Sequence, residues 1–126
     1  MTQFNYDLEE RTAKFGEEVV VFARSLKIDP VNARILDQLI GAVGSTGANY
    51  CEAVEAESRK DFIHKISICK KEVREARHWL RLLARAHPER KAEILKFSKE
   101  AHELLLIFAK IVRSARSNQL NNSPID

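Results

Sequence analysis

The stretch SRKDFIHKISICKKEVREARHWLRLLARAHP, residues 58–88, decides the fold of this chain. Its apolar residues recur at spacings of four and three without a break, which is the period of a helix that packs in a bundle. Ser58 and Asp61 resemble a capping box at the start, and His87-Pro88 marks a turn at the end. The stretch therefore predicts an amphipathic helix over residues 59–86. Its seam consists of Phe62, Ile66, Cys69, Val73, Ala76, Leu80 and Leu83.

Three other segments repeat this period and predict helices over residues 7–27, 30–57 and 88–117. Asp29-Pro30 separates the first two, because Asp is a good N-cap and Pro suits the first helical position. The first seam is Leu8, Phe15, Val19, Phe22 and Leu26, with Thr12 at one weak position, and the last is Ile94, Phe97, Ala101, Leu104, Phe108, Ile111 and Ala115. Four long helices joined by short turns predict an all-α fold, an up-down-up-down antiparallel four-helix bundle over residues 1–117. The polar residues 118–126 are expected to form a flexible tail.

The segment 30–57 contains Gly41, Gly44 and Gly47 in the middle of a seam formed by Leu36, Ile40, Val43, Gly47, Tyr50 and Val54. Each Gly costs about 1 kcal/mol relative to Ala inside a helix. Either a neighbouring helix approaches closely there, or the helix breaks near Gly44. Since neither Pro nor a polar cluster accompanies the glycines, a continuous helix is favoured.

Composition bounds the class of protein. The 126 residues are 44% hydrophobic and 31% charged, which is typical of one folded, helix-rich domain. No apolar run is long enough to span a bilayer, and the N-terminus lacks the basic and apolar regions of a signal peptide. We therefore expect a cytoplasmic protein.

The sequence offers little for catalysis or metal binding. Glu75-x-x-His78 occurs once, whereas a ferritin-like di-metal site needs two such motifs and two further inward-facing Glu residues. Cys51 and Cys69 lack CxxC spacing, and no histidine has a Ser or Cys partner at a spacing that suggests a nucleophile. We expect no enzyme activity, no metal and no cofactor. The histidines are His64, His78, His87 and His102.

Charge is distributed unevenly along the chain. Residues 1–57 hold five basic and ten acidic residues, while residues 58–126 hold sixteen and eight, so the two parts carry −5 and +8. Within the segment 59–86 the basic residues form one stripe, which suits phosphate because Arg can donate two parallel hydrogen bonds. The candidate nucleic-acid-binding residues are Lys70, Arg74, Arg77, Arg81 and Arg85. Two alternatives stay open: the stripe pairs with the acidic part of a neighbouring subunit, or it is a solvated surface.

The last helix carries more apolar residues than one buried face requires, so part of it is expected to contact another subunit. The additional residues are Leu95, Leu105, Leu106, Ile107 and Val112.

Residues 38–83 resemble the four-helix-bundle family of proteins encoded in intervening sequences of bacterial 23S ribosomal RNA genes. The resemblance lies in Gln38-Leu39, Ser45-Thr46-Gly47-Ala48-Asn49-Tyr50, Glu52-Ala53, Ser58, Asp61-Phe62, Lys65, Ile68, Lys71-Glu72 and Trp79-Leu80-Arg81-Leu82-Leu83. Thr46 departs from the family, which more often has an aliphatic residue there, and this bears on packing more than on function.

The resemblance implies a ring-like homopentamer of bacterial origin and supplies no catalytic residues. The family is similar to the accessory variability protein of diversity-generating retroelements, a basic pentameric bundle that works with a reverse transcriptase and nucleic acid. Together, stripe and resemblance predict a non-enzymatic oligomer that binds RNA or DNA backbone. The alternative is a protein-interaction scaffold that docks a partner such as a reverse transcriptase without contacting nucleic acid.

Overall fold

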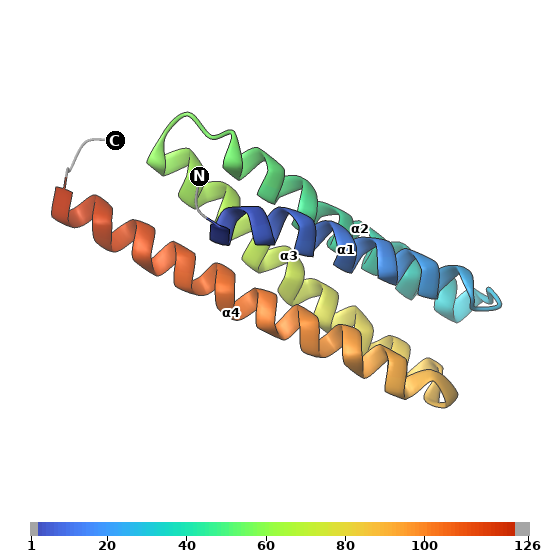
Figure 1. The fold of residues 1–126 in the computed structure, drawn as a ribbon. Helices are drawn as coiled ribbons and strands as arrows, with labels where there is room; N and C mark the ends of the chain where they lie inside the picture. Colours follow the sequence, from blue (N-terminus) through green and yellow to red (C-terminus); the bar gives the residue numbers. More distant parts are fainter. Residues whose placement is uncertain (1–2, 123–126) are drawn as a thin grey trace.

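Four α-helices run back and forth along one long axis in a computed structural model that describes residues 3–122, with side chains described for residues 8–118 (Figure 1). In chain order the elements are α1 (Gln3–Arg24), α2 (Pro30–Val54), α3 (Arg59–Ala86), the 3-10 turn η1 (Pro88–Arg90) and α4 (Lys91–Asn122). The described part contains no strand. The predicted all-α helical bundle is thereby confirmed.

The helix starts are fixed by the residues that the sequence singles out. Asp29 accepts hydrogen bonds from the backbone N–H groups of Val31 and Asn32 at 2.9 and 2.7 Å. The Asn32 side chain returns a bond by accepting from the Asp29 N–H, which completes a capping box. Ser58 caps α3 by accepting from the Asp61 N–H at 3.0 Å. These bonds satisfy donors that would otherwise be unpaired at a helix start.

Three predicted limits of α1 and α2 differ from the observed ones. α1 ends at Arg24 rather than at residue 27, because both the N–H and the hydroxyl of Ser25 bond to the Phe22 carbonyl and tighten the last turn. α2 ends at Val54 rather than at 57, because the Glu55 N–H donates to the Glu52 carbonyl, three residues back, instead of continuing the α-helical pattern. α1 also begins at Gln3, before the first residue of its seam.

The last helix extends into the segment 118–126 that was predicted to be a flexible tail. α4 begins at Lys91, after the separate turn η1, and continues through Asn122. Neither Gly nor Pro, the strongest signals for a helix end, occurs between Ser117 and Asn122. Residues 123–126 lie outside the described part of the chain.

α2 is continuous through Gly41, Gly44 and Gly47, as predicted. Close helix approach explains only Gly47, where an added Cβ would lie 3.7 Å from the Thr12 hydroxyl of α1. A Cβ at Gly41 or Gly44 would meet no atom within 4 Å. These two glycines are therefore not required by packing within the monomer.

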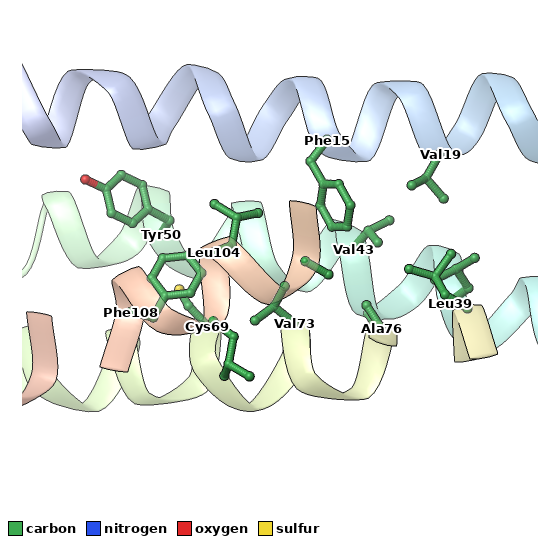
Figure 2. Close-up of a cluster of buried hydrophobic side chains, with 14 of the residues drawn as sticks. Phe15, Val19, Leu39, Val43, Tyr50, Cys69, Val73, Ala76, Leu104 and Phe108 are labelled. Atoms are coloured by element: carbon green, nitrogen blue, oxygen red, sulfur yellow. The ribbon is translucent and has the colours of Figure 1, made fainter. Parts of the chain in front are cut away.

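The core runs the length of the bundle and takes side chains from all four helices. Figure 2 shows Phe15 and Val19 of α1, Tyr50 of α2 and Phe108 of α4 pointing into one shared interior. Tyr50 and Phe108 pack with their ring centroids 6.3 Å apart. Burial raises the pKa of the Cys69 thiol to about 12, and this thiol donates a hydrogen bond to the Thr46 carbonyl at 3.4 Å. Cys69 is therefore an unreactive core residue.

The predicted seam of α2 needs a correction. Val54 is exposed and Ile40 only half-buried, whereas Leu39, Thr46 and Ala53 are buried. The difference arises because α2 packs against both α1 and α3, so its buried face is wider and turned towards α3. The Thr46 hydroxyl is satisfied by donating to the Ala42 carbonyl at 2.8 Å.

The four helix interfaces are unequal. α2 with α3 and α3 with α4 pack along most of their lengths, whereas α1 and α4 touch at few points. A groove of about 510 Å³ lies between α1 and α4, with Phe22 and Phe97 among its walls. Arg11 of α1 spans this seam to Glu100 of α4 through two bonds of 2.7 Å. The basic helix α3 therefore lies between α2 and α4 and does not pack against α1 within the described chain.

Candidate nucleic-acid interface

The basic stripe of α3 lies outside the core. The seam of α3 is buried from Ile66 to Leu83, with Ile63 rather than Phe62 as its fully covered first residue. Arg74, Arg81 and Arg85 are exposed, while Lys70 and Arg77 are half-buried at the edge of the seam. The five predicted residues thus lie along the solvent-facing side of one helix. We call them the α3 stripe.

The heptad positions show which flank of α3 carries the stripe. Lys65 reaches Glu52 of α2, with its Nζ 2.7 Å from Oε1, so this flank of α3 faces α2. The same flank carries Glu72 and Trp79, which follow one and two heptads later. Lys70 and Arg77 belong to the opposite flank. Since α3 packs against α2, η1 and α4 alone within the described chain, that flank faces α4.

The cations of the α3 stripe lack acidic partners. No carboxylate within residues 8–118 lies within 4.0 Å of a side-chain nitrogen of these five residues. Glu75, the nearest acid in the sequence, instead accepts a hydrogen bond from the Trp79 indole at 3.1 Å. By contrast, Lys65 on the other flank of α3 is paired, and its hydrogen bond to Glu52 raises its pKa. The stripe is therefore a row of charge available to an external anion.

Arg77 is held by packing rather than by an ion pair. Its Nε is buried and has no hydrogen-bond partner. A buried donor without an acceptor is unfavourable by about 1–3 kcal/mol, so such groups are rare in folded proteins. Fixing the stem of Arg77 against the protein surface reduces the side-chain entropy that a phosphate contact would otherwise cost.

The structure extends the basic surface onto α4, which the sequence reading missed. Lys99, His102, Arg113 and Arg116 are exposed on the outer side of α4. These four residues occupy two heptad positions of α4, and no acidic residue occupies either position anywhere in the helix. The acidic residues of α4 lie at other heptad positions. A helical wheel of α4 with Ala101 and Leu104 facing the core, like the one used for α3, would have identified these basic residues from the sequence.

The acids of α4 mostly point the other way, towards α1. Glu100 pairs with Arg11 of α1, and Glu93 lies with Glu17 and Glu18 around the groove between α1 and α4. The difference in charge between the two parts of the sequence thus becomes a difference between two sides of the bundle, α1–α2 acidic and α3–α4 basic.

The other candidate sites show ordinary structural contacts. His78 packs edge-on against the Trp79 ring, with centroids 5.1 Å apart, and is exposed like Glu75. Within the part of the chain that the structure describes, no three His, Cys, Asp or Glu side chains gather as metal ligands would. His87 lies 3.0 Å through Nε2 from the buried Asn32 amide, which links the α1–α2 turn to the α3–α4 turn.

Among the described helices, none is both long and apolar enough to cross a membrane.

Comparison with known proteins agrees with this architecture. A crystal structure of a protein of unknown function from the S23 ribosomal protein family of Bacteroides thetaiotaomicron VPI-5482 superposes with a TM-score of 0.72 at 28% identity, over 82% of this chain and 96% of that one. No curated protein matches the chain significantly. The family model of the 23S rRNA-intervening sequence protein matches residues 5–119. The chain therefore belongs to the 23S rRNA-intervening sequence protein family, as the motifs of residues 38–83 predict.

Proposed function

We propose that this protein is a non-enzymatic, homo-oligomeric bundle that binds the phosphate backbone of RNA or DNA through the α3 stripe. The observation that supports this proposal is a row of five cations that have no acidic partner among residues 8–118, although Lys65 on the same helix has one. The buried Nε of Arg77 supports it, because the stem of this side chain is packed against the protein without a counter-charge in the described residues.

The dimensions of the stripe suit a nucleic-acid backbone. Lys70 and Arg85 are fifteen residues apart in one helix, which places their Cα atoms about 22 Å apart. A row of this length can contact several consecutive phosphates. Contacts of this kind position a protein without reading bases, so binding should tolerate any sequence and weaken with salt.

Assembly of several copies of the chain would strengthen binding to the phosphate backbone. The resemblance to a pentameric family leads us to propose that several copies of the α3 stripe act on one nucleic acid. Linked sites raise the overall affinity without any new contact, provided that the geometry allows them to bind together.

The test is a fluorescence-anisotropy titration of labelled duplex RNA and DNA at several salt concentrations between 50 and 200 mM. The variant Arg74→Ala/Arg77→Ala/Arg81→Ala should bind more weakly, and its salt slope should fall by about 3, since each lost phosphate contact removes about 1. The matched control is Lys14→Ala/Arg24→Ala/Arg34→Ala, which removes three exposed cations from α1 and α2. Equal affinities for wild type and the α3 variant would count against the stripe.

A second candidate function is a scaffold that docks a partner protein, such as a reverse transcriptase, and touches nucleic acid only indirectly. The apolar grooves beside α1 favour this candidate, because exposed apolar surface marks sites of protein contact. A partner that stays bound in a pull-down after nuclease treatment, together with no nucleic-acid binding by the isolated protein, would support the scaffold.

A further inference from the structure

The groove between α1 and α4 combines aromatic rings with carboxylates, and nothing in the described chain fills it. Its volume is about 510 Å³. The rings of Phe22 and Phe97 meet edge to face in its wall, with their centroids 5.5 Å apart, and Val21 adds an aliphatic side chain that is 70% exposed. We call this surface the α1–α4 groove. Its carboxylates are those of Glu17, Glu18, Glu93 and Glu100.

Each end of the α1–α4 groove holds an arginine of the chain itself. At one end the guanidinium of Arg90 lies over the Phe22 ring, with its Cζ 4.7 Å from the ring centroid, and donates to Glu93 at 3.2 Å. At the other end Arg11 donates twice to Glu100 at 2.7 Å. The groove thus binds guanidinium groups through the two features that suit them, an aromatic face and a carboxylate.

The centre of the groove lacks such a cation. Arg11, Glu18 and Ser25 follow one another at intervals of seven, so they share one flank of α1. This flank faces α4, because its first member pairs with α4 and the hydroxyl of its last accepts a hydrogen bond from Arg90 at 2.9 Å. Glu18 lies between them. No basic side-chain nitrogen within residues 8–118 lies within 4.0 Å of the carboxylate of Glu17 or Glu18.

Lys96 also lines the groove but forms no ion pair there within the described residues. The pKa of Glu93 is lowered first by its hydrogen bond with Arg90 and only last by the charge of Lys96. Carboxylates that are brought together repel one another unless cations lie among them. A cation supplied by another molecule would therefore be favoured beside Glu17 and Glu18.

The occupant that fits this groove presents cations and apolar side chains on one face. Nucleic acid does not fit, because carboxylates repel phosphates. The basic helix α3 of a second copy does not fit either, because its apolar seam from Ile66 to Leu83 is buried in its own core. An amphipathic helix fits, since it can lay apolar residues in a groove and carry charge along the edges. Glu93 and Glu100 are seven residues apart, about 10 Å, which matches two turns of such a helix.

We propose that the α1–α4 groove binds an arginine-bearing amphipathic helix of a partner protein. Its arginine pairs with Glu17 and Glu18, and its aliphatic side chains pack against Val21 and Phe97. Arginine suits the site because a guanidinium can lie against a ring and bond to a carboxylate together, as Arg90 does. The inference names the partner chemistry for the scaffold candidate and does not require nucleic-acid binding by the α3 stripe.

The experiment is a fluorescence-anisotropy titration of a labelled helical peptide with the full chain. The probe is an alanine-based peptide of about 15 residues, long enough to form a helix, with leucines at heptad spacing and arginines beside them. Two control peptides carry glutamate in place of the arginines, or serine in place of the leucines. Each control should bind at least about tenfold more weakly than the probe, because the groove requires both charge and apolar contact.

The carboxylates are tested in the protein itself. Glu17→Gln/Glu18→Gln should weaken binding of the probe about tenfold, because ion pairs covered by a partner are stronger than solvated ones. The matched control is Glu55→Gln/Glu57→Gln, which removes two exposed acids between α2 and α3 and should bind like wild type. Circular dichroism checks that each variant is folded.

The apolar wall is tested in the same assay. Val21→Gln should weaken binding of the probe about fivefold, because a polar side chain replaces apolar surface that the partner covers. Val31→Gln is the control, since Val31 is similarly exposed, at 63%, but lies at the start of α2 and outside the groove.

Three results would overturn the proposal. The first is no rise in anisotropy up to about 100 µM protein, and the second is equal binding of the probe to wild type and Glu17→Gln/Glu18→Gln. The third is a change in particle mass by light scattering in that variant, which would show that another copy of the chain occupies the groove. The variant keeps the α3 stripe, so it should retain nucleic-acid binding in the salt titration. The two proposals can therefore fail separately.

Discussion

The α1–α2 side and the α3–α4 side of this bundle share one core but differ at their surfaces. The acidic side contains open glycines and exposed valines, whereas the basic side contains the α3 stripe, whose cations have no acidic partner among the described residues. Acid and base meet within the described chain where helices adjoin, as in the Lys65–Glu52 and Arg11–Glu100 pairs. Away from those seams, charges of both signs, among them Arg74 and Glu17, have no ion-pair partner within the described residues. The comparison suggests that the two sides are surfaces for different partners, supported by one scaffold.

The core that joins the two sides should show the largest effect. Phe108→Ala removes a fully buried ring that packs on Tyr50 across the bundle, and we expect a loss of about 3–5 kcal/mol in the free energy of unfolding. Both sides should unfold in one transition, because they share this contact. Urea denaturation followed by circular dichroism and by Trp79 fluorescence measures it, and Leu82→Ala at the surface serves as the control. Two separate transitions would show that the sides are independent units.

The link between the two interhelical turns should show an intermediate effect. Asn32→Ala removes a buried amide that donates to the Lys27 carbonyl, contacts His87 and accepts from the Asp29 N–H, so we expect a loss of about 1–3 kcal/mol. Asn49→Ala is the matched control, because the Asn49 amide bonds only to Ser45 one turn earlier in α2. Thermal or chemical denaturation compares the two. Equal losses would mean that Asn32 acts as a local cap alone.

The thin seam between α1 and α4 should show the smallest effect. Arg11→Met removes the paired bonds to Glu100 but keeps most of the side-chain volume, and since both partners are about one-third exposed we expect about 0.2–1 kcal/mol. Arg24→Met, at an exposed Arg of the same helix, is the control. The difference between the two variants should shrink in 1 M salt, where exposed charges are screened. A loss of several kcal/mol would show that this ion pair, rather than the core, holds α1 in place.

The sequence predicts the helices well where apolar spacing and capping residues agree. Ser58 and the unbroken seam that follows it define α3, and Asp29-Pro30 defines the start of α2. Prediction is poorer at helix ends, where α1 stops because Ser25 bonds to its own preceding turn, and α4 continues through a polar segment that contains neither Gly nor Pro. It also misplaces the buried face of α2, since a helix between two neighbours buries a face wider than one seam.

The candidate interface, too, could be predicted from the sequence only in part. The α3 stripe can be read from one helix, because residues spaced by three and four share a face whatever the fold. The basic residues of α4, the open Gly44 and the position of Glu18 in the α1–α4 groove gain meaning only when other helices are placed around them.

By itself the sequence determined which residues lie together on each helix, because that depends only on the helical period and on local capping. The tertiary structure decided which of those faces meet each other and which remain uncovered, because burial and charge neutralisation depend on neighbours that are distant in the chain. For that reason the α3 stripe could be named in advance, whereas its lack of acidic partners among the described residues and the open groove beside α1 could be found only in the folded bundle.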